Sequence, residues 1–196
     1  MSDHWHHLLA TLRSVHAAVP AMADFCAWPE DAQFIEPETD TVAATQQLAD
    51  YSGTGSNLTD PVLKAFQNIA PVASWRQSYS EAEMGPDFMQ RYGFIEVVGP
   101  GGAFQTHSMQ AYLGYWGPDL LYDWHHHTAE ELYLVVAGQG FFQADGLADQ
   151  ILRPGEIRIH KSNQDHAMRT ADEPVIIYAL WRGQGVGEKP LAGRLQ

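Results

Sequence analysis

Residues 124–133 read WHHHTAEELY and hold three of the ten histidines of the chain. In a β-strand alternate residues share a face, so His125 and His127 would project together, about 6 to 7 Å apart, while His126 points the other way. Glu131 and Tyr133 share a face for the same reason. We expect the Glu131 strand to pair with the histidine strand, which would bring the carboxylate beside the imidazoles. This segment therefore predicts a cation site built on two strands.

A further imidazole, from His166, would complete a site with three nitrogen ligands and one oxygen ligand. Such a set accommodates one divalent ion, Zn(II), Fe(II), Mn(II), Co(II) or Ni(II), with positions left open for a substrate. His160 is a rival fourth ligand. We prefer His166, because His160 alternates with Ile157 and Ile159 and should point away from the face that they bury. Metal availability and site geometry decide the metal more than residue type does, so all five ions stay open.

A single histidine in a half-buried strand is more often a hydrogen-bonded core residue than a ligand. Three histidines and a glutamate in this order favour a metal site instead. The histidines near the start of the chain are expected on the solvated surface of the first helix, outside the site; these are His4, His6, His7 and His16.

The spacing of these ligands resembles the two motifs of the cupin superfamily. The first is His125-x-His127-x3-Glu131-x6-Gly138, and the second is His166 after the Pro154-Gly155 turn. The resemblance covers roughly the C-terminal half and implies a mainly β fold, a cupin-type β-barrel (double-stranded β-helix or jelly roll). The second motif departs from the broad family, because His166 lies further along than usual and no asparagine follows it closely.

The hydrophobic pattern also predicts a barrel in this half of the chain. From about Phe94, apolar residues alternate with period 2 in short runs that turn residues separate. Eight such runs favour a closed barrel or jelly roll, which leaves no exposed sheet edges. The predicted strands are Phe94–Val98, Met109–Tyr115, Leu121–His127, Glu131–Val136, Gly140–Ala144, Glu156–His160, His166–Thr170 and Val175–Trp181.

The N-terminal part has helical periodicity. Apolar residues recur at helical spacing over residues 5–19, and a second short helix is expected at Val42–Asp50. A third helix has a clear start, with Asp60 as the N-cap and Pro61 at the first helical position. The length of 196 residues suits one domain with an appended segment. We expect a helical extension at 1–90 that packs on a metal-binding barrel at 91–196.

The net charge and the cysteine content limit which binding partners and which cellular compartment we expect. The formal net charge is −13, which repels nucleic acid and anionic membranes, so neither is an expected partner. Cys26 is the only cysteine, which excludes an intramolecular disulfide and fits a reducing cytoplasm. No secretory leader or membrane-spanning run is recognisable. We expect a cytoplasmic protein, with a homodimer as an open option.

A narrower resemblance exists to the cupin dimethylsulfoniopropionate (DMSP) lyases of marine bacteria. It is carried by residues 124–133, by HAMRT at 166–170 and by WRG at 181–183, together with the N-terminal helices and the length. In that family a tyrosine two residues after the glutamate ligand is implicated as a metal ligand and catalytic base, and Tyr133 holds that position. The resemblance also places Tyr122 and Trp181 in the pocket, with Tyr122 as a second candidate catalytic residue. Trp28, in an acidic loop, is a further candidate to close over it.

The chemistry of this reaction suits these residues. Cleavage of zwitterionic DMSP to dimethyl sulfide and acrylate is a β-elimination, so a base must remove a weakly acidic proton next to a carboxylate. A divalent ion would withdraw charge from the transition state and favour the phenolate of Tyr133. Aromatic faces of Tyr122, Trp181 and Trp28 would attract the sulfonium. A strict pleat turns Tyr122 away from the histidines, so its place in the pocket requires a bulge.

Two other functions use the same residues. A cupin-type non-haem iron dioxygenase would hold Fe(II) with the same ligands and bind oxygen at an open position. A non-catalytic small-ligand-binding cupin is the other alternative, against which an intact metal site argues. Tyr133 separates the lyase from the dioxygenase, because only the lyase needs a tyrosine base.

Overall fold

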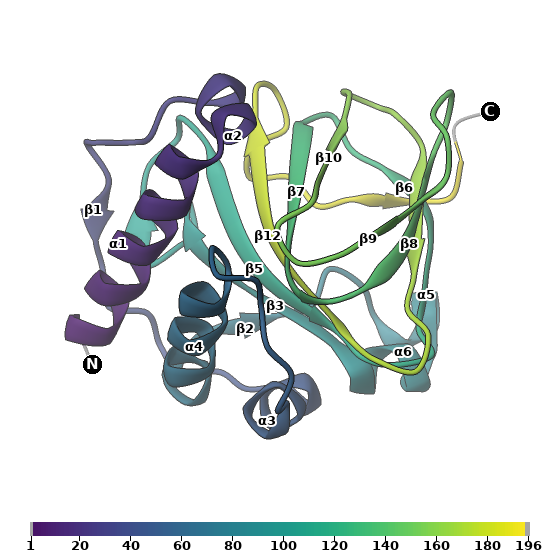
Figure 1. Ribbon diagram of the computed structural model, residues 1–196, viewed down its shortest axis with the longest axis horizontal. Coiled ribbons are helices and arrows are strands. Elements are labelled where there is room, and N and C mark those ends of the chain that lie inside the picture. The colour runs from purple at the N-terminus through teal and green to yellow at the C-terminus, as the bar shows by residue number, and fades with distance from the viewer. Residues whose placement is uncertain (1, 195–196) are drawn as a thin grey trace.

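Two β-sheets facing each other form the body of the protein, which Figure 1 shows as a computed structural model. The structure describes residues 2–194, and over that range one sheet has eight strands and the other has five. The strands are β1 Gln33–Phe34, β2 Trp75–Arg76, β3 Tyr92–Val98, β4 Phe104–Gln105, β5 Gln110–Trp116, β6 Leu121–His126, β7 Glu130–Gly138, β8 Gly140–Ala144, β9 Gln150–Leu152, β10 Ile157–His160, β11 His166–Arg169, β12 Val175–Arg182 and β13 Leu191–Ala192.

The two sheets form the two walls of a barrel. The large sheet runs β1-β4-β3-β5-β12-β7-β10, with β2 on β3, and the small sheet runs β13-β6-β11-β8-β9. Consecutive strands β6 and β7 therefore belong to opposite walls. The mainly β, cupin-type fold expected from the sequence is confirmed.

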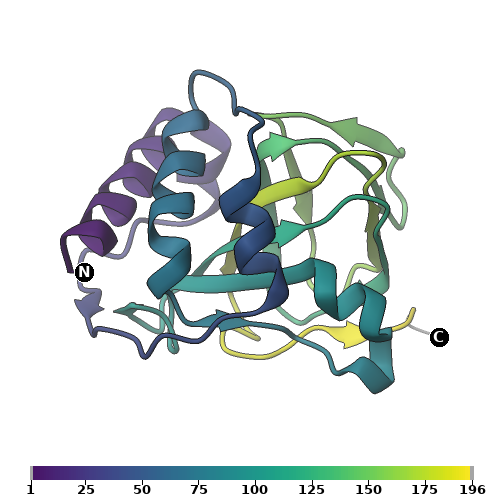
Figure 2. The same ribbon diagram turned by 90° about the horizontal axis from the view of Figure 1, so that it is seen from below.

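Helices cover the outer face of the large sheet. Figure 2 shows α1, α4 and α3 next to one another on that side, away from the small sheet. The helices are α1 Ser2–Ala18, α2 Pro20–Phe25, α3 Ala43–Asp50, α4 Asp60–Ile69, the 3₁₀ helix η1 Ala70–Val72, α5 Glu81–Met84 and α6 Pro86–Arg91. Within residues 2–194, no helix combines the length and the apolar character that crossing a membrane would require.

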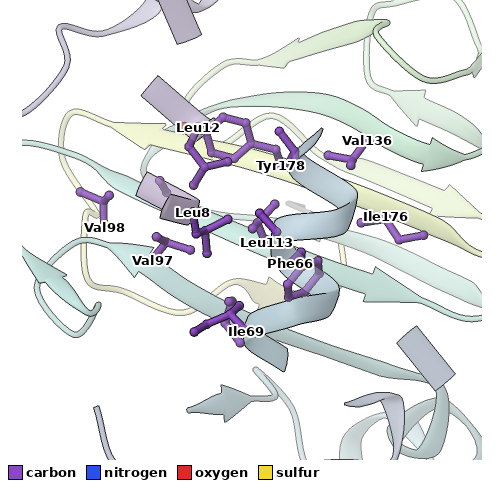
Figure 3. Packing of buried hydrophobic residues seen from close by; sticks show 14 of the residues in the cluster. Leu8, Leu12, Phe66, Ile69, Val97, Val98, Leu113, Val136, Ile176 and Tyr178 are labelled. Carbon is purple, nitrogen blue, oxygen red and sulfur yellow. The ribbon is translucent and has the colours of Figure 1, made fainter. Parts of the chain in front are cut away.

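One hydrophobic core joins these helices to the large sheet. In Figure 3, Leu8 and Leu12 of α1 and Phe66 of α4 point towards Leu113 and Tyr178 of the sheet, and all five side chains are fully buried. Burying each such side chain contributes about 1.5 to 3 kcal/mol. The helical region therefore packs directly on the barrel wall.

The predicted strands differ from the observed ones only at their ends. Each of the eight predicted strands is present, shifted by no more than two residues at either end. The strands β1, β2, β4, β9 and β13 were not predicted, because two or three residues are too short to show a period of two.

The start of α4 corrects one expectation. Thr59, and not Asp60, occupies the N-cap position. The Thr59 hydroxyl donates to the carbonyl of Val136 on the barrel (2.7 Å), while the Asp60 carboxylate pairs with Lys64 one turn later. The Thr59 side chain therefore fixes the loop before α4 to the sheet, although the local sequence favours Asp60 as the N-cap.

His16 is a second correction, because it is buried and not on the solvated surface. It lies in the last turn of α1, and only 4% of the residue is exposed. Its Nε2 lies 2.9 Å from the carbonyl oxygen of Cys26. Burial lowers the pKa of His16, and the hydrogen bond to Cys26 only partly opposes this shift.

Candidate active site

The predicted site residues meet between the two sheets, and not on one pair of adjacent strands. The small sheet supplies His125 from β6, His166 from β11 and, just after β6, His127; the large sheet supplies Glu131 and Tyr133 from β7. The expectation that β6 pairs with β7 is wrong, because β7 pairs with β12 and β10. The turn between His126 and Glu130 instead carries the chain from one wall to the other.

Three of the predicted ligands form a compact buried group. The nearest ligand atoms of His127, Glu131 and His166 lie within 4.8 Å of one another. Oε2 of Glu131 is 3.4 Å from Nε2 of His127 and 3.3 Å from Nε2 of His166. His125 lies beside this group, with its ring centroid 4.1 Å from that of His166 and 6.4 Å from that of His127.

The imidazoles are held in the tautomer that a metal ligand needs. The Nδ1 atom of each ring lies 2.8 Å from a backbone carbonyl oxygen: His125 on Asp123, His127 on Ala129 and His166 on Gln164. Since a carbonyl only accepts, each Nδ1 carries the proton and each Nε2 presents a lone pair.

Two of these lone pairs are left without partners inside the protein. Nε2 of His127 and of His166 is buried, and no group within the described residues 2–194 makes a hydrogen bond to it. Buried polar atoms without partners are rare in folded proteins and call for an explanation. Together with the Glu131 carboxylate, they make a donor set that fits a divalent ion such as Zn(II) or Fe(II).

His160 also belongs to this cluster, which corrects the reason for setting it aside. It is 1% exposed, and its Nδ1 lies 2.8 Å from Oε2 of Glu131. Ile159 is 43% exposed, so the isoleucine side of β10 faces outward and His160 faces the interior. Burial lowers the pKa of His160 to about 4. Sequence alone could not place it, because the pairing of His160 with Glu131 depends on the register of β10 on β7.

Glu131 faces three imidazoles and an indole. Burial alone would raise the pKa of its carboxyl group, but its interactions with His127 above all, and with His160 and His166, hold that pKa well below its usual range. Its second oxygen, Oε1, accepts a 2.6 Å hydrogen bond from the indole nitrogen of Trp181. The carboxylate is therefore ionised and fixed in orientation.

A cavity of about 260 Å³ opens onto this cluster. Tyr122, Tyr133 and Trp181 line it, as do His125, His127 and Glu131. The rest of its wall is rich in aromatic rings that sequence reasoning did not single out, namely Tyr92, Phe94, Tyr112 and Trp116. These residues come from β3 and β5, and their inward orientation follows only once the strand order is known.

Tyr122 reaches the cavity through an irregularity of strand pairing. The register between β6 and β11 shifts between His166 and Met168, opposite residues 122–125. This is the kind of bulge that a place for Tyr122 beside the histidines requires. The Tyr122 ring stacks on that of His125, with centroids 4.0 Å apart.

Both buried tyrosines hold their protons tightly in the protein alone. Burial raises the pKa of Tyr122 well above 10, and burial together with the nearby Glu131 carboxylate does the same for Tyr133. A base role for Tyr133 thus needs a positive charge close by.

The structure does not bring Trp28 to the cavity. Its indole packs edge-on against His16, with ring centroids 5.3 Å apart, on the helical side of the large sheet. It is not among the described residues that line the cavity. The prediction that Trp28 closes over the site is therefore corrected. Trp28 packs against the hydrophobic core instead.

Charged side chains at the cavity wall were also missed. Arg76 donates from its guanidinium to the buried Glu96 (2.7 Å), and Gln110 donates to the same carboxylate. The backbone amide of Gly187 donates to Gln110, which ties the C-terminal segment to the cavity wall. No local motif marks these residues, because strands and segments far apart in sequence bring them together.

Comparison with known proteins gives consistent matches over most of the chain. A family model described as dimethylsulfoniopropionate lyase matches residues 13–177. The curated lyase DddQ of Ruegeria pomeroyi is 34% identical over 180 residues, which span 91% of this chain and 89% of the relative.

Two solved structures superpose closely on this chain. A chain from the crystal structures of the DMSP lyases RdDddP and RnDddQII has a TM-score of 0.95 at 39% identity, with 98% of this chain and 99% of that chain covered. The crystal structure of DMSP lyase DddQ from Ruegeria pomeroyi has a TM-score of 0.91 at 32% identity, over 97% and 96% of the two chains.

Proposed function

The chain belongs to the dimethylsulfoniopropionate lyase family and is a lyase, and from this premise we propose that it cleaves DMSP by a metal-dependent β-elimination with Tyr133 as the base. One observation carries the proposal. The Tyr133 side chain and the His127, Glu131 and His166 group line or adjoin one cavity, and the Tyr133 ring centroid is 6.4 Å from that of His166.

The ligands we propose are His125, His127, Glu131 and His166, with Tyr133 as a further ligand. A divalent ion held there would supply positive charge, which favours the phenolate of Tyr133 and a negatively charged transition state. The fit rests on the two unpartnered Nε2 atoms and on the ionised carboxylate between them.

The elimination needs one proton transfer and one bond cleavage. The Tyr133 phenolate would take the proton from the carbon next to the substrate carboxylate. The electron pair of that C–H bond forms the C=C bond of acrylate, and the C–S electron pair leaves with sulfur as neutral dimethyl sulfide. Tyr133 then carries the proton and must return it to solvent before the next turnover.

The aromatic wall suits the cationic end of the substrate. Tyr112 and Trp181 meet edge to face at 5.5 Å, and both line the cavity with Tyr122. Cation–π attraction of about 0.5 to 2 kcal/mol per ring would hold the sulfonium there. Family membership and this wall together favour the lyase over a dioxygenase or a plain binding cupin.

The proposal can be tested by incubating metal-loaded protein with DMSP. Gas chromatography of the headspace then measures the dimethyl sulfide that is formed. We expect dimethyl sulfide with the wild-type protein and almost none after the metal is removed. Dimethyl sulfide formation that survives complete metal removal would contradict the metal-dependent mechanism. The cytoplasmic location, the homodimer and the division into regions at residue 90 stay predictions from the sequence.

A further inference from the structure

His160 touches three groups of the proposed site at once. Its Nδ1 lies 2.8 Å from Oε2 of Glu131. Its ring stacks on that of His166, with centroids 4.0 Å apart and planes within 16°, and meets the Tyr133 ring edge-on at 5.1 Å. The residue comes from β10 of the large sheet, whereas His166 comes from the small sheet, so this contact spans the two walls.

The hydrogen bond made by Nδ1 separates His160 from the three ligand histidines, although its Nε2 is likewise buried without a hydrogen-bond partner within residues 2–194. Their Nδ1 atoms donate to backbone carbonyls, which leaves Nε2 free for a cation. His160 instead directs Nδ1 at the carboxylate of Glu131. An ionised carboxylate only accepts, so Nδ1 of His160 carries the proton and donates it.

We propose that His160 is a positioning residue: its Nδ1–H orients the Glu131 carboxylate, and it does not itself ligate the ion. This inference rests on the proposed metal site. Partners of this kind, which hydrogen-bond to a ligating carboxylate and fix its orientation, commonly change metal affinity or activity by about 10- to 100-fold when they are removed.

Two substitutions separate the hydrogen bond from the ring. His160→Phe keeps a flat ring against His166 but removes the donor to Glu131. His160→Asn removes the ring but keeps an N–H donor near the position of Nδ1. A residue that only fills space would be replaced better by Phe, and a positioning donor would be replaced better by Asn.

The experiment titrates Co(II) into the metal-free full-length protein, with a competing chelator to set the dissociation constant and the visible absorption of Co(II) to report its coordination. We expect His160→Phe to weaken Co(II) binding about 10-fold or more and to change the absorption band. His160→Asn should restore most of the affinity and a band close to that of the wild type. Thermal melting of each variant shows that it is folded.

Each other outcome overturns the inference. Equal Co(II) affinity and an unchanged band in His160→Phe would make His160 a space-filling residue. Loss of affinity in both variants would make it a ligand. A wild-type protein that binds no Co(II) would overturn the proposed metal site as well, which distinguishes the two failures.

A measurement on the wild-type protein covers the case in which His160→Phe fails to fold. Nitrogen-15 NMR of the zinc-loaded protein should show His160 protonated at Nδ1, with an Nε2 signal that zinc does not shift as it shifts those of His127 and His166. A zinc-bound Nε2 on His160 would overturn the inference.

Discussion

The indole nitrogen of Trp181 donates a 2.6 Å hydrogen bond to Oε1 of Glu131, and both side chains are buried. The Trp181 ring also lies against that of His127, with centroids 4.2 Å apart. Trp181 was predicted only as a face for the sulfonium. Its edge additionally fixes the one carboxylate of the proposed metal site.

Substitution Trp181→Phe keeps an aromatic face but removes this donor. We expect metal affinity to fall about 10-fold, because Glu131 loses a partner that orients it. The matched control is Trp116→Phe, which changes another indole of the same cavity wall whose nitrogen has no hydrogen-bond partner within residues 2–194. Equal losses of affinity, measured by chelator competition, would show that ring size and not the hydrogen bond matters.

Substitution Tyr133→Phe should remove the proposed base while leaving the cavity shape nearly unchanged. We expect turnover of DMSP to fall by about 100-fold or more, with metal still bound at wild-type stoichiometry. Tyr178→Phe is the control, because that hydroxyl is buried on the helical side, in the core of Figure 3. Dimethyl sulfide release at the wild-type rate from Tyr133→Phe would rule out the tyrosine base.

Alkaline pH should destabilise the fold through its buried tyrosines. Burial raises the pKa of Tyr79 to about 12, against about 10 for an unfolded chain. Between these values the unfolded chain has lost the proton that the folded protein keeps, so the free energy of unfolding falls as pH rises from about 10 towards 12. Thermal melts across this range should show the decline, and Tyr79→Phe should make it shallower. An equally steep decline in the variant would show that Tyr79 does not contribute.

Substitution Leu12→Ala should test the joint core of helices and barrel. Leu12 of α1 is fully buried against the large sheet, so its truncation should lower the free energy of unfolding by about 2 to 5 kcal/mol. Leu147→Ala, at a half-exposed position, should cost far less. Urea denaturation measures both, and similar small losses would mean that α1 adds little to stability.

Local pattern predicted the eight longer strands and the fold class, because a period of two over four or more residues is readable without a structure. It also predicted that His125 and His127 point to the same side, and both line the cavity, although β6 ends at His126. It did not predict that β6 and β7 lie on opposite walls, because pairing partners are set by the whole topology.

The same limit explains the errors at single residues. The exposure of Ile159, and with it the inward face of His160, depends on which side of β10 meets the rest of the barrel. The burial of His16 and the place of Trp28 depend on how residues 26–28 fold back onto α1. None of these relationships is encoded within a window of neighbouring residues.

The proposed ligands come from both walls of the barrel, the imidazoles from the small sheet and the Glu131 carboxylate and the Tyr133 phenol from the large sheet. An ion bound by both would act as a further cross-link between walls that the chain already joins through turns, such as the one between His126 and Glu130. Its binding free energy would then add to the cohesion of the barrel, so resistance to unfolding should rise with the concentration of free ion. A shortage of that ion would then lower both the activity of the protein and its resistance to unfolding.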